Sequence, residues 1–294
     1  MSGEVVSHVS DTARWVAVYR AIESERPDAV FRDPFADRLA GPRGRQIAAK
    51  IPRSMRSGWW MVARTKIIDD LIADAIASGC DRVLNLAAGL DTRPYRLELP
   101  DELTWVEADL PGLLTEKEHL LDGETPRCRL IRVPVDLADP EARDRFLDEA
   151  LAGASKALVL TEGLLMYLEP ADVDDLTRAL TRPQVAWWVL DLTGPGLKRM
   201  MNEKLGGLLA NTPFKFAPEQ GVRYFEERGW RATDIEPHIV AAARLRRLPW
   251  FLRVLAALPQ PDPHHPPLKR PWNAVVRLTR SDSFSPGGSG SGGD

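Results

Sequence analysis

The chain has 294 residues, of which 44% are hydrophobic and 28% are charged, and this composition excludes an extended disordered protein. The 39 basic residues against 42 acidic ones give a net charge of −3, which argues against a nucleic-acid-binding protein and favours a small organic partner.

The sequence shows no sign of export or of membrane insertion. Its first residues lack the basic and apolar regions of a signal peptide, and no apolar run approaches the ~18 residues of a membrane helix. Cys80 and Cys128 have neither the pattern of a disulfide framework nor that of a zinc site. We therefore expect a cytoplasmic protein with reduced thiols, no metal, and no membrane or nucleic-acid partner. The oligomeric state stays open.

Two helical patterns come first in the chain. In residues 10–25, helical spacing places four apolar side chains on one face, namely Trp15, Val18, Tyr19 and Ile22. The second pattern covers residues 55–78 and ends before Gly79. We expect residues 1–60 to form a helical lid that lines a pocket with aromatic side chains, Trp59 and Trp60 among them.

Short apolar runs then alternate with helical patterns. The predicted strands are residues 82–88, 104–109, 129–134, 157–161, 185–190, 230–235 and 273–279. The predicted helices after the first strand are residues 113–121, 140–151, 170–180, 197–209 and 218–228. This alternation predicts an α/β fold with a mostly parallel sheet covered on both faces, finished by a C-terminal antiparallel hairpin. The Gly/Ser-rich tail, residues 281–294, is expected to be disordered.

Ligands of an open parallel sheet bind beyond the carboxyl ends of its strands. The first predicted strand ends in Ala87, Ala88 and Gly89, whose small side chains would let a ligand approach the backbone, although an ordinary tight turn explains them equally well. Asp109 closes the second strand, 20 residues after Gly89, where an acid can accept hydrogen bonds from both ribose hydroxyls. This spacing fits a cofactor that contains adenosine.

The glycine pattern selects among such cofactors. A dinucleotide needs Gly-x-Gly-x-x-Gly to seat its pyrophosphate on a helix N-terminus, but this loop has one glycine and carries Asp91 at the helix start. S-adenosylmethionine has no phosphate and carries a cationic sulfonium, so it fits better. A nicotinamide-dependent oxidoreductase remains the less favoured alternative.

Further polar residues follow the later strands. Asp136 and Leu137 come after the third strand and suit an adenine amine and ring, although Asp136 could also cap a helix, a role for which Asp139 is better placed. Glu162 follows the fourth strand, where a carboxylate is poorly explained by packing. Arg64 could grip a carboxylate with both arms of its guanidinium group, although a surface arginine is the plainer interpretation.

Several motifs resemble the leucine carboxyl methyltransferase-like family of class I S-adenosylmethionine-dependent methyltransferases, including its bacterial small-molecule branch. The most specific are Gly-Leu-Asp-Thr-Arg at residues 89–93 and Glu-Gly-Leu-Leu-Met-Tyr-Leu at residues 162–168. The first of these is part of a longer match at residues 84–97. Further matches lie at residues 9–13, 19–23, 32–36, 63–66, 107–110 and 133–137. Many relatives have Gly-Ala-Gly where this chain has Ala87-Ala88-Gly89, and the C-terminal third carries little that matches.

The resemblance implies a Rossmann-like methyltransferase domain over residues 61–280, with a seven-stranded sheet. It also implies the cofactor residues, which are Arg64 at the methionine carboxylate, Ala87 and Gly89 in the loop, Asp109 and Leu110 at the ribose end, Asp136 and Leu137 at the adenine, and Glu162 near the methionine. The expected reaction is O-methylation of a small phenol or carboxylate, such as a polyketide phenol. The alternative is carboxyl methylation of a protein C-terminus.

Methyl transfer from a sulfonium needs alignment more than a base. A carboxylate acceptor is already ionised at neutral pH, whereas a phenol with a pKa near 10 would benefit from a base. The candidates for that role are His8, Tyr19, Tyr167 and His238, and their spacing does not rank them.

Overall fold

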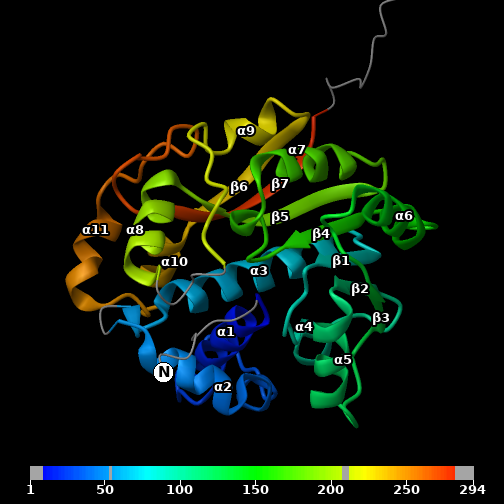
Figure 1. Ribbon diagram of the computed structural model, residues 1–294, viewed down its shortest axis with the longest axis horizontal. Helices are drawn as coiled ribbons and strands as arrows, with labels where there is room; N and C mark the ends of the chain where they lie inside the picture. The colour runs from blue at the N-terminus through cyan, green and yellow to red at the C-terminus, as the bar shows by residue number, and fades with distance from the viewer. Residues whose placement is uncertain (1–8, 53–54, 207–211, 282–294) are drawn as a thin grey trace, which may run out of the picture.

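The computed structural model describes residues 9–52, 55–206 and 212–281 (Figure 1). The strands are β1 (Arg82–Leu86), β2 (Thr104–Asp109), β3 (Arg129–Pro134), β4 (Ala157–Thr161), β5 (Val185–Thr193), β6 (Trp230–Pro237) and β7 (Asn273–Arg280). They form one seven-stranded sheet in the order β3-β2-β1-β4-β5-β7-β6. The first five strands of this order pair in parallel, and β7 is antiparallel to both β5 and β6. The predicted parallel sheet with a C-terminal antiparallel pair is confirmed.

Helices cover both faces of the sheet. They are α1 (Val9–Ser24), α2 (Ala36–Lys50), α3 (Trp59–Ala77), α4 (Arg93–Arg96), α5 (Pro111–Leu120), α6 (Pro140–Leu151), α7 (Pro170–Ala179), α8 (Pro195–Leu205), α9 (Arg223–Glu226), α10 (His238–Arg244) and α11 (Arg253–Ala257), with 3₁₀ turns η2 (Leu165–Tyr167) and η3 (Trp250–Leu252). Because side chains alternate along a strand, Val83 packs with α3 and α10 on one face. Leu84 and Leu86 pack with α6, α7 and α9 on the other.

Most element boundaries agree with the sequence pattern to within a few residues, and Trp188 is a fully buried core residue as expected. Two expectations were wrong. Ile22 is 52% exposed, because α1 buries only Trp15, Val18 and Tyr19 of the predicted face. The helix predicted for residues 218–228 is reduced to the four residues of α9, because turns occupy the segment before it.

Helices α1 and α2 lie together below the sheet, next to the start of α3 (Figure 1). Gly58 precedes α3 with a φ of +59°, and a Cβ there would lie 2.1 Å from the Tyr19 ring. Glycine at this position therefore lets α1 approach α3 closely. The predicted boundary at residue 60 falls in the first turn of α3, and the division into lid and domain stays a prediction.

Three predictions concern residues that are not described. The tail lies outside the described residues except for Ser281, and so do His8 and residues 207–209 of the helix predicted for residues 197–209. Within the described ranges, no helix is both long and apolar enough to cross a membrane.

Candidate active site

A cavity of about 1390 Å³ opens beyond the carboxyl ends of the parallel strands. The structure brings all of the predicted cofactor residues to its wall, namely Arg64, Ala87, Gly89, Asp109, Leu110, Asp136, Leu137 and Glu162. Cavities that hold one drug-sized ligand measure about 300–1,000 Å³. This cavity is therefore large enough for a cofactor together with a second molecule.

The loop after β1 is locked to the end of β2. The Asp109 carboxylate is buried, and its two oxygens accept the Gly89 and Leu110 backbone N–H groups, each at 2.7 Å. Burial raises the pKa of Asp109, and these two N–H groups oppose the rise. Each carboxylate oxygen keeps a second lone pair for a ligand hydroxyl.

Ala87 has a φ of +56°, which is uncommon for a residue other than glycine. Relatives that have glycine here would adopt this conformation without steric cost. The chain thus keeps the left-handed turn despite the departure from Gly-Ala-Gly, and strained backbone of this kind concentrates at functional sites.

Asp136 and Asp139 have separate roles at the start of α6. Asp139 is the N-cap and accepts the Glu141 and Ala142 N–H groups at 3.0 and 3.3 Å, which confirms the cap predicted for it. Asp136 is exposed at the cavity edge, where one of its oxygens accepts the Ala138 N–H at 3.0 Å. The helix therefore does not need Asp136 as its cap.

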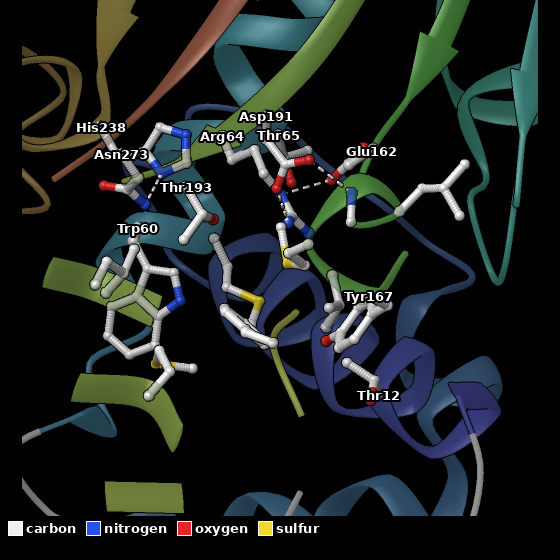
Figure 2. Close-up of a pocket in the computed structure, with 18 of the residues that line it drawn as sticks. Thr12, Trp60, Arg64, Thr65, Glu162, Tyr167, Asp191, Thr193, His238 and Asn273 are labelled. Carbon is white, nitrogen blue, oxygen red and sulfur yellow. Dashed lines mark hydrogen bonds and ion pairs between the residues drawn. The ribbon is translucent and has the colours of Figure 1, made fainter. Parts of the chain in front are cut away.

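A cluster of charged side chains closes the inner end of the cavity. Arg64 Nε lies 2.9 Å from Glu162 Oε1, and Arg64 Nη1 donates to Asp191 Oδ2 at 2.8 Å (Figure 2). Arg93 Nη1 donates to the second oxygen of Glu162 at 2.7 Å and to Asp91 at 2.9 Å. Arg64 thus makes a hydrogen bond to Asp191 and an ion pair with Glu162, and Nε forms no hydrogen bond with a described residue. Nη2 is available for a ligand.

The cluster continues into the core. Arg93 Nε donates to Asp69 at 2.7 Å, and Asp69 also accepts two hydrogen bonds from Arg96. Burial alone would raise the pKa of Glu162, but the Arg93 and Arg64 guanidinium groups hold it below its usual value. With Asp91 and Asp191, the cluster contains four carboxylates against three guanidinium groups. Its net charge therefore favours a cationic ligand.

The other lobe of the cavity is mainly apolar. Its lining includes Met55, Trp59, Trp60, Met61, Leu197, Met200, Met201, Phe214, Phe251 and Leu255. Asn273 at the start of β7 and His238 at the start of α10 add a polar pair, in which Asn273 Nδ2 lies 2.7 Å from His238 Nδ1 (Figure 2). An amide nitrogen can only donate, so Nδ1 accepts and the ring proton is on Nε2.

His238 is buried, and its Nε2 has no hydrogen-bond partner among the described residues. Burial lowers its pKa to about 3, and the Arg64 charge acts in the same direction. The imidazole is therefore neutral at physiological pH. Because the residue lines the cavity, Nε2–H is a buried donor suited to an oxygen of a bound molecule.

The other predicted base candidates have different positions. Tyr167 lines the cavity, and burial raises its pKa to about 12. Tyr19 is not among the lining residues; it is buried between Trp15 and Trp60, with ring centroids 6.1 and 6.3 Å away. Tyr167 and His238 are thus the described candidates that reach the cavity.

Sequence reasoning did not single out Arg93, Asp191 or Asn273 as site residues. Asp191 follows the apolar run of β5, the same signal that singled out Asp109 in β2, and it accepts the Gly163 N–H at 2.7 Å. Arg93 lies inside a recognised motif, but nothing in the motif pairs it with Glu162. Asn273 faces His238 because β7 pairs with β6, with Pro237 opposite Ala274.

The sequence pattern of the leucine carboxyl methyltransferase family matches residues 13–181. A candidate S-adenosyl-L-methionine-dependent methyltransferase of Parafrankia is 31% identical over 82% of this chain and 83% of its own. A protein of the same description from Streptomyces coelicolor is 34% identical over 77% of this chain and 84% of its own.

Solved structures share the fold. A DUF574 family protein from Streptomyces avermitilis superposes with a TM-score of 0.60 at 14% identity, over 92% of this chain and 97% of its own. A candidate methyltransferase from Thermobifida fusca gives 0.57 at 17% identity, over 92% and 94%. At this identity the likeness concerns the fold alone.

The strand order, the cavity at the strand ends and these relatives define a Rossmann-like S-adenosylmethionine-dependent methyltransferase. More narrowly, the chain belongs to the leucine carboxyl methyltransferase family.

Proposed function

We propose that the protein is an O-methyltransferase whose acceptor is the carboxylate of a small, largely apolar molecule. The observation that carries this proposal is the neutral His238, whose Nε2–H is a buried donor without a partner among the described residues, in a mainly apolar lobe. Such a donor suits one oxygen of a carboxylate and leaves the other oxygen available for reaction.

The charged lobe fits the cofactor. In this proposal Asp109 accepts the ribose hydroxyls, Asp136 and Leu137 hold the adenine, and Ala87, Gly89 and Leu110 form the wall of the adenosyl pocket. Arg64 takes the methionine carboxylate with Nη2, and Glu162 belongs to the excess of negative charge beside the sulfonium. When bound, S-adenosylmethionine supplies an electrophilic methyl group on a positively charged sulfur.

The mainly apolar lobe, called the acceptor lobe below, has residues that favour an acceptor that is already ionised. With a pKa of about 3, His238 is a weak base, and a Tyr167 hydroxyl with a pKa of about 12 keeps its own proton. A phenol with a pKa near 10 would find no strong base in either side chain. A carboxylate with a pKa near 4 needs none.

In the proposed reaction, the free carboxylate oxygen of the acceptor would take the methyl group, and the uncharged thioether of the cofactor would be the leaving group. His238 and Asn273 orient the acceptor for this in-line attack. Holding reacting atoms in line can lower a barrier by roughly 7–11 kcal/mol. The surrounding tryptophan and methionine side chains exclude water.

His238→Ala should reduce kcat/KM for a carboxylate acceptor about 10- to 100-fold, mainly through KM, because a hydrogen bond to a charged group is lost. Asn273→Asp should lower kcat/KM by a similar factor, although His238 is still present. An aspartate can only accept a hydrogen bond, so the imidazole proton would move to Nδ1, and Nε2 would then be an acceptor instead of a donor. The dissociation constant of S-adenosylmethionine should stay unchanged in both variants. His265→Ala, at an exposed loop position, is the control.

The pH profile is a separate check. Because His238 is neutral at every pH well above 3 and the acceptor is ionised above about pH 5, kcat/KM should be flat from pH 5.5 to about 8.5. A rise of activity with pH across this interval would mean that a base is titrating, and the phenol alternative would replace the carboxylate.

The acceptor class can be read from methyl labelling. Purified enzyme with radiolabelled S-adenosylmethionine should convert apolar carboxylic acids to base-labile esters and leave the matching phenols unlabelled. The family's description also keeps a second candidate, the C-terminal carboxylate of a protein. Label that appears in cell protein but not in extracted metabolites would identify a protein C-terminus as the acceptor. Cytoplasmic location and the lid formed by residues 1–60 belong to the proposal as well.

A further inference from the structure

Large apolar side chains are exposed in one segment of the surface. Of the nine large hydrophobic residues that are exposed among those described, six lie between residues 250 and 268: Trp250, Phe251, Val254, Leu255, Leu258 and Leu268. The first five have the spacing of one helical face, and they lie on η3, α11 and the residue after α11. Trp250 is 80% exposed and Val254 69%. This group is called the apolar patch below.

The patch has a basic border. Residues 244–270 contain six basic residues and one acidic residue, in a chain whose overall charge is negative. Arg246, Arg253, Lys269 and Arg270 are exposed, and none of them forms an ion pair with a residue that the structure describes. The patch therefore combines apolar side chains with uncompensated positive charge.

The patch also lies at a mouth of the cavity. Phe251, Leu255 and Leu258 line the cavity and are each at least half exposed, and Arg270 lines it as well. The cofactor end has a mouth of its own at Leu110, just before α5. Figure 1 places α11 and α5 at opposite sides of the molecule. The patch thus borders the acceptor lobe and not the adenosyl pocket.

We propose that the apolar patch docks on the surface of an anionic lipid bilayer. Interfacial helices insert aromatic and aliphatic side chains below the headgroups while basic residues contact anionic lipids, and the patch supplies both. The six apolar residues and the four exposed basic ones make ten, fewer than the roughly 20–30 residues that one side of a stable protein interface uses. Shallow insertion needs far fewer, so lipid fits better than an acidic protein or a second copy of the chain.

This docking revises the expectation of no membrane partner, because a peripheral contact needs no spanning helix. The docking proposal does not depend on the acceptor proposed above. If the acceptor is apolar, the same mouth would receive it from the lipid phase.

The test is flotation of the full chain with vesicles of phosphatidylcholine alone or of phosphatidylcholine mixed with phosphatidylglycerol. The wild type should float with the anionic vesicles, and high salt should release it. The double variant Trp250→Ser/Val254→Ser should bind about tenfold more weakly or worse, since two side chains no longer insert. Neither residue lines the cavity, so loss of vesicle binding would not reflect a damaged active site.

Charge is tested with Arg253→Gln/Lys269→Gln, which should lose the preference for anionic vesicles. The control variants are Ile131→Ser, an exposed apolar residue on the edge strand β3, and Arg145→Gln/Arg231→Gln, two exposed arginines elsewhere; both should bind like the wild type. Circular dichroism checks that each variant folds. Wild-type protein that stays unbound at low salt would overturn the proposal. Equal vesicle binding by the patch variants and the control variants would also overturn it. A third contradicting result would be a protein that does not bind vesicles but forms a dimer in sedimentation velocity, if Trp250→Ser/Val254→Ser abolishes that dimer.

Discussion

Asp109→Ala is expected to weaken S-adenosylmethionine binding by about 30- to 150-fold, the effect of removing a buried, charged acceptor from ligand hydroxyls. The carboxylate also joins the Gly89 and Leu110 N–H groups, each at 2.7 Å, so its loss frees the loop after β1. Asp109→Asn should bind little better, because its amide nitrogen would face one of these two donors. Isothermal titration calorimetry measures both variants.

The matched control for Asp109 is Asp139→Ala, which removes a carboxylate from the same edge of the sheet. Loss of the N-cap should cost about 1 kcal/mol of stability without changing cofactor affinity. Unchanged binding by Asp109→Ala would show that the cofactor does not use this carboxylate. Equal losses in both variants would point to general disturbance of the strand ends.

Arg93→Met is expected to lower the free energy of unfolding by about 3–5 kcal/mol, because it leaves buried carboxylates without their counter-charge. The guanidinium group is fully buried and contacts Asp69, Asp91 and Glu162 at 2.7–2.9 Å. Urea unfolding followed by circular dichroism gives the difference. Arg145→Met, at an exposed position of α6, should change the free energy of unfolding little.

The sign of the pH dependence makes this prediction sharper. In the wild type, Asp91 and Glu162 have lowered pKa values despite their burial, because of Arg93 and its neighbours. Their contribution to stability is present above the unfolded-state pKa near 4 and is lost as the pH falls below it. Without Arg93, burial should raise these pKa values, so Arg93→Met should gain stability as the pH falls from about 7.5 to 5.5. A variant that loses stability over this interval would contradict the proposed role of Arg93.

The strand-end residues illustrate what could be predicted from the sequence. Asp109, Asp136 and Glu162 each follow a short apolar run, and parallel strands bring the ends of such runs to one edge of a sheet. Their convergence on one cavity therefore follows from local pattern and a general topological rule. Asp191 has the same signal, since it follows the apolar run predicted to end at Leu190, although β5 continues to Thr193.

The acceptor lobe could not be predicted in this way. His238 and Asn273 belong to elements that are 35 residues apart in sequence, and they meet because β6 and β7 form an antiparallel pair beside β5. The sequence pattern also does not predict α2, because Gly41 leaves the helical conformation with a φ of +57° and Pro42 follows it, so that α2 consists of two short helical pieces joined at a kink. Long-range pairing and tolerated kinks leave little trace in a local sequence window.

The two mouths of the cavity, at Leu110 and at the apolar patch, have a kinetic consequence. A site with a single opening forces its ligands to leave in the reverse of the order in which they bound. In the proposed arrangement, with the cofactor at the Leu110 end and the acceptor at the apolar patch, each ligand would have its own exit. An ester product would then depart while the demethylated cofactor is still seated, and fresh acceptor would bind before that cofactor is exchanged.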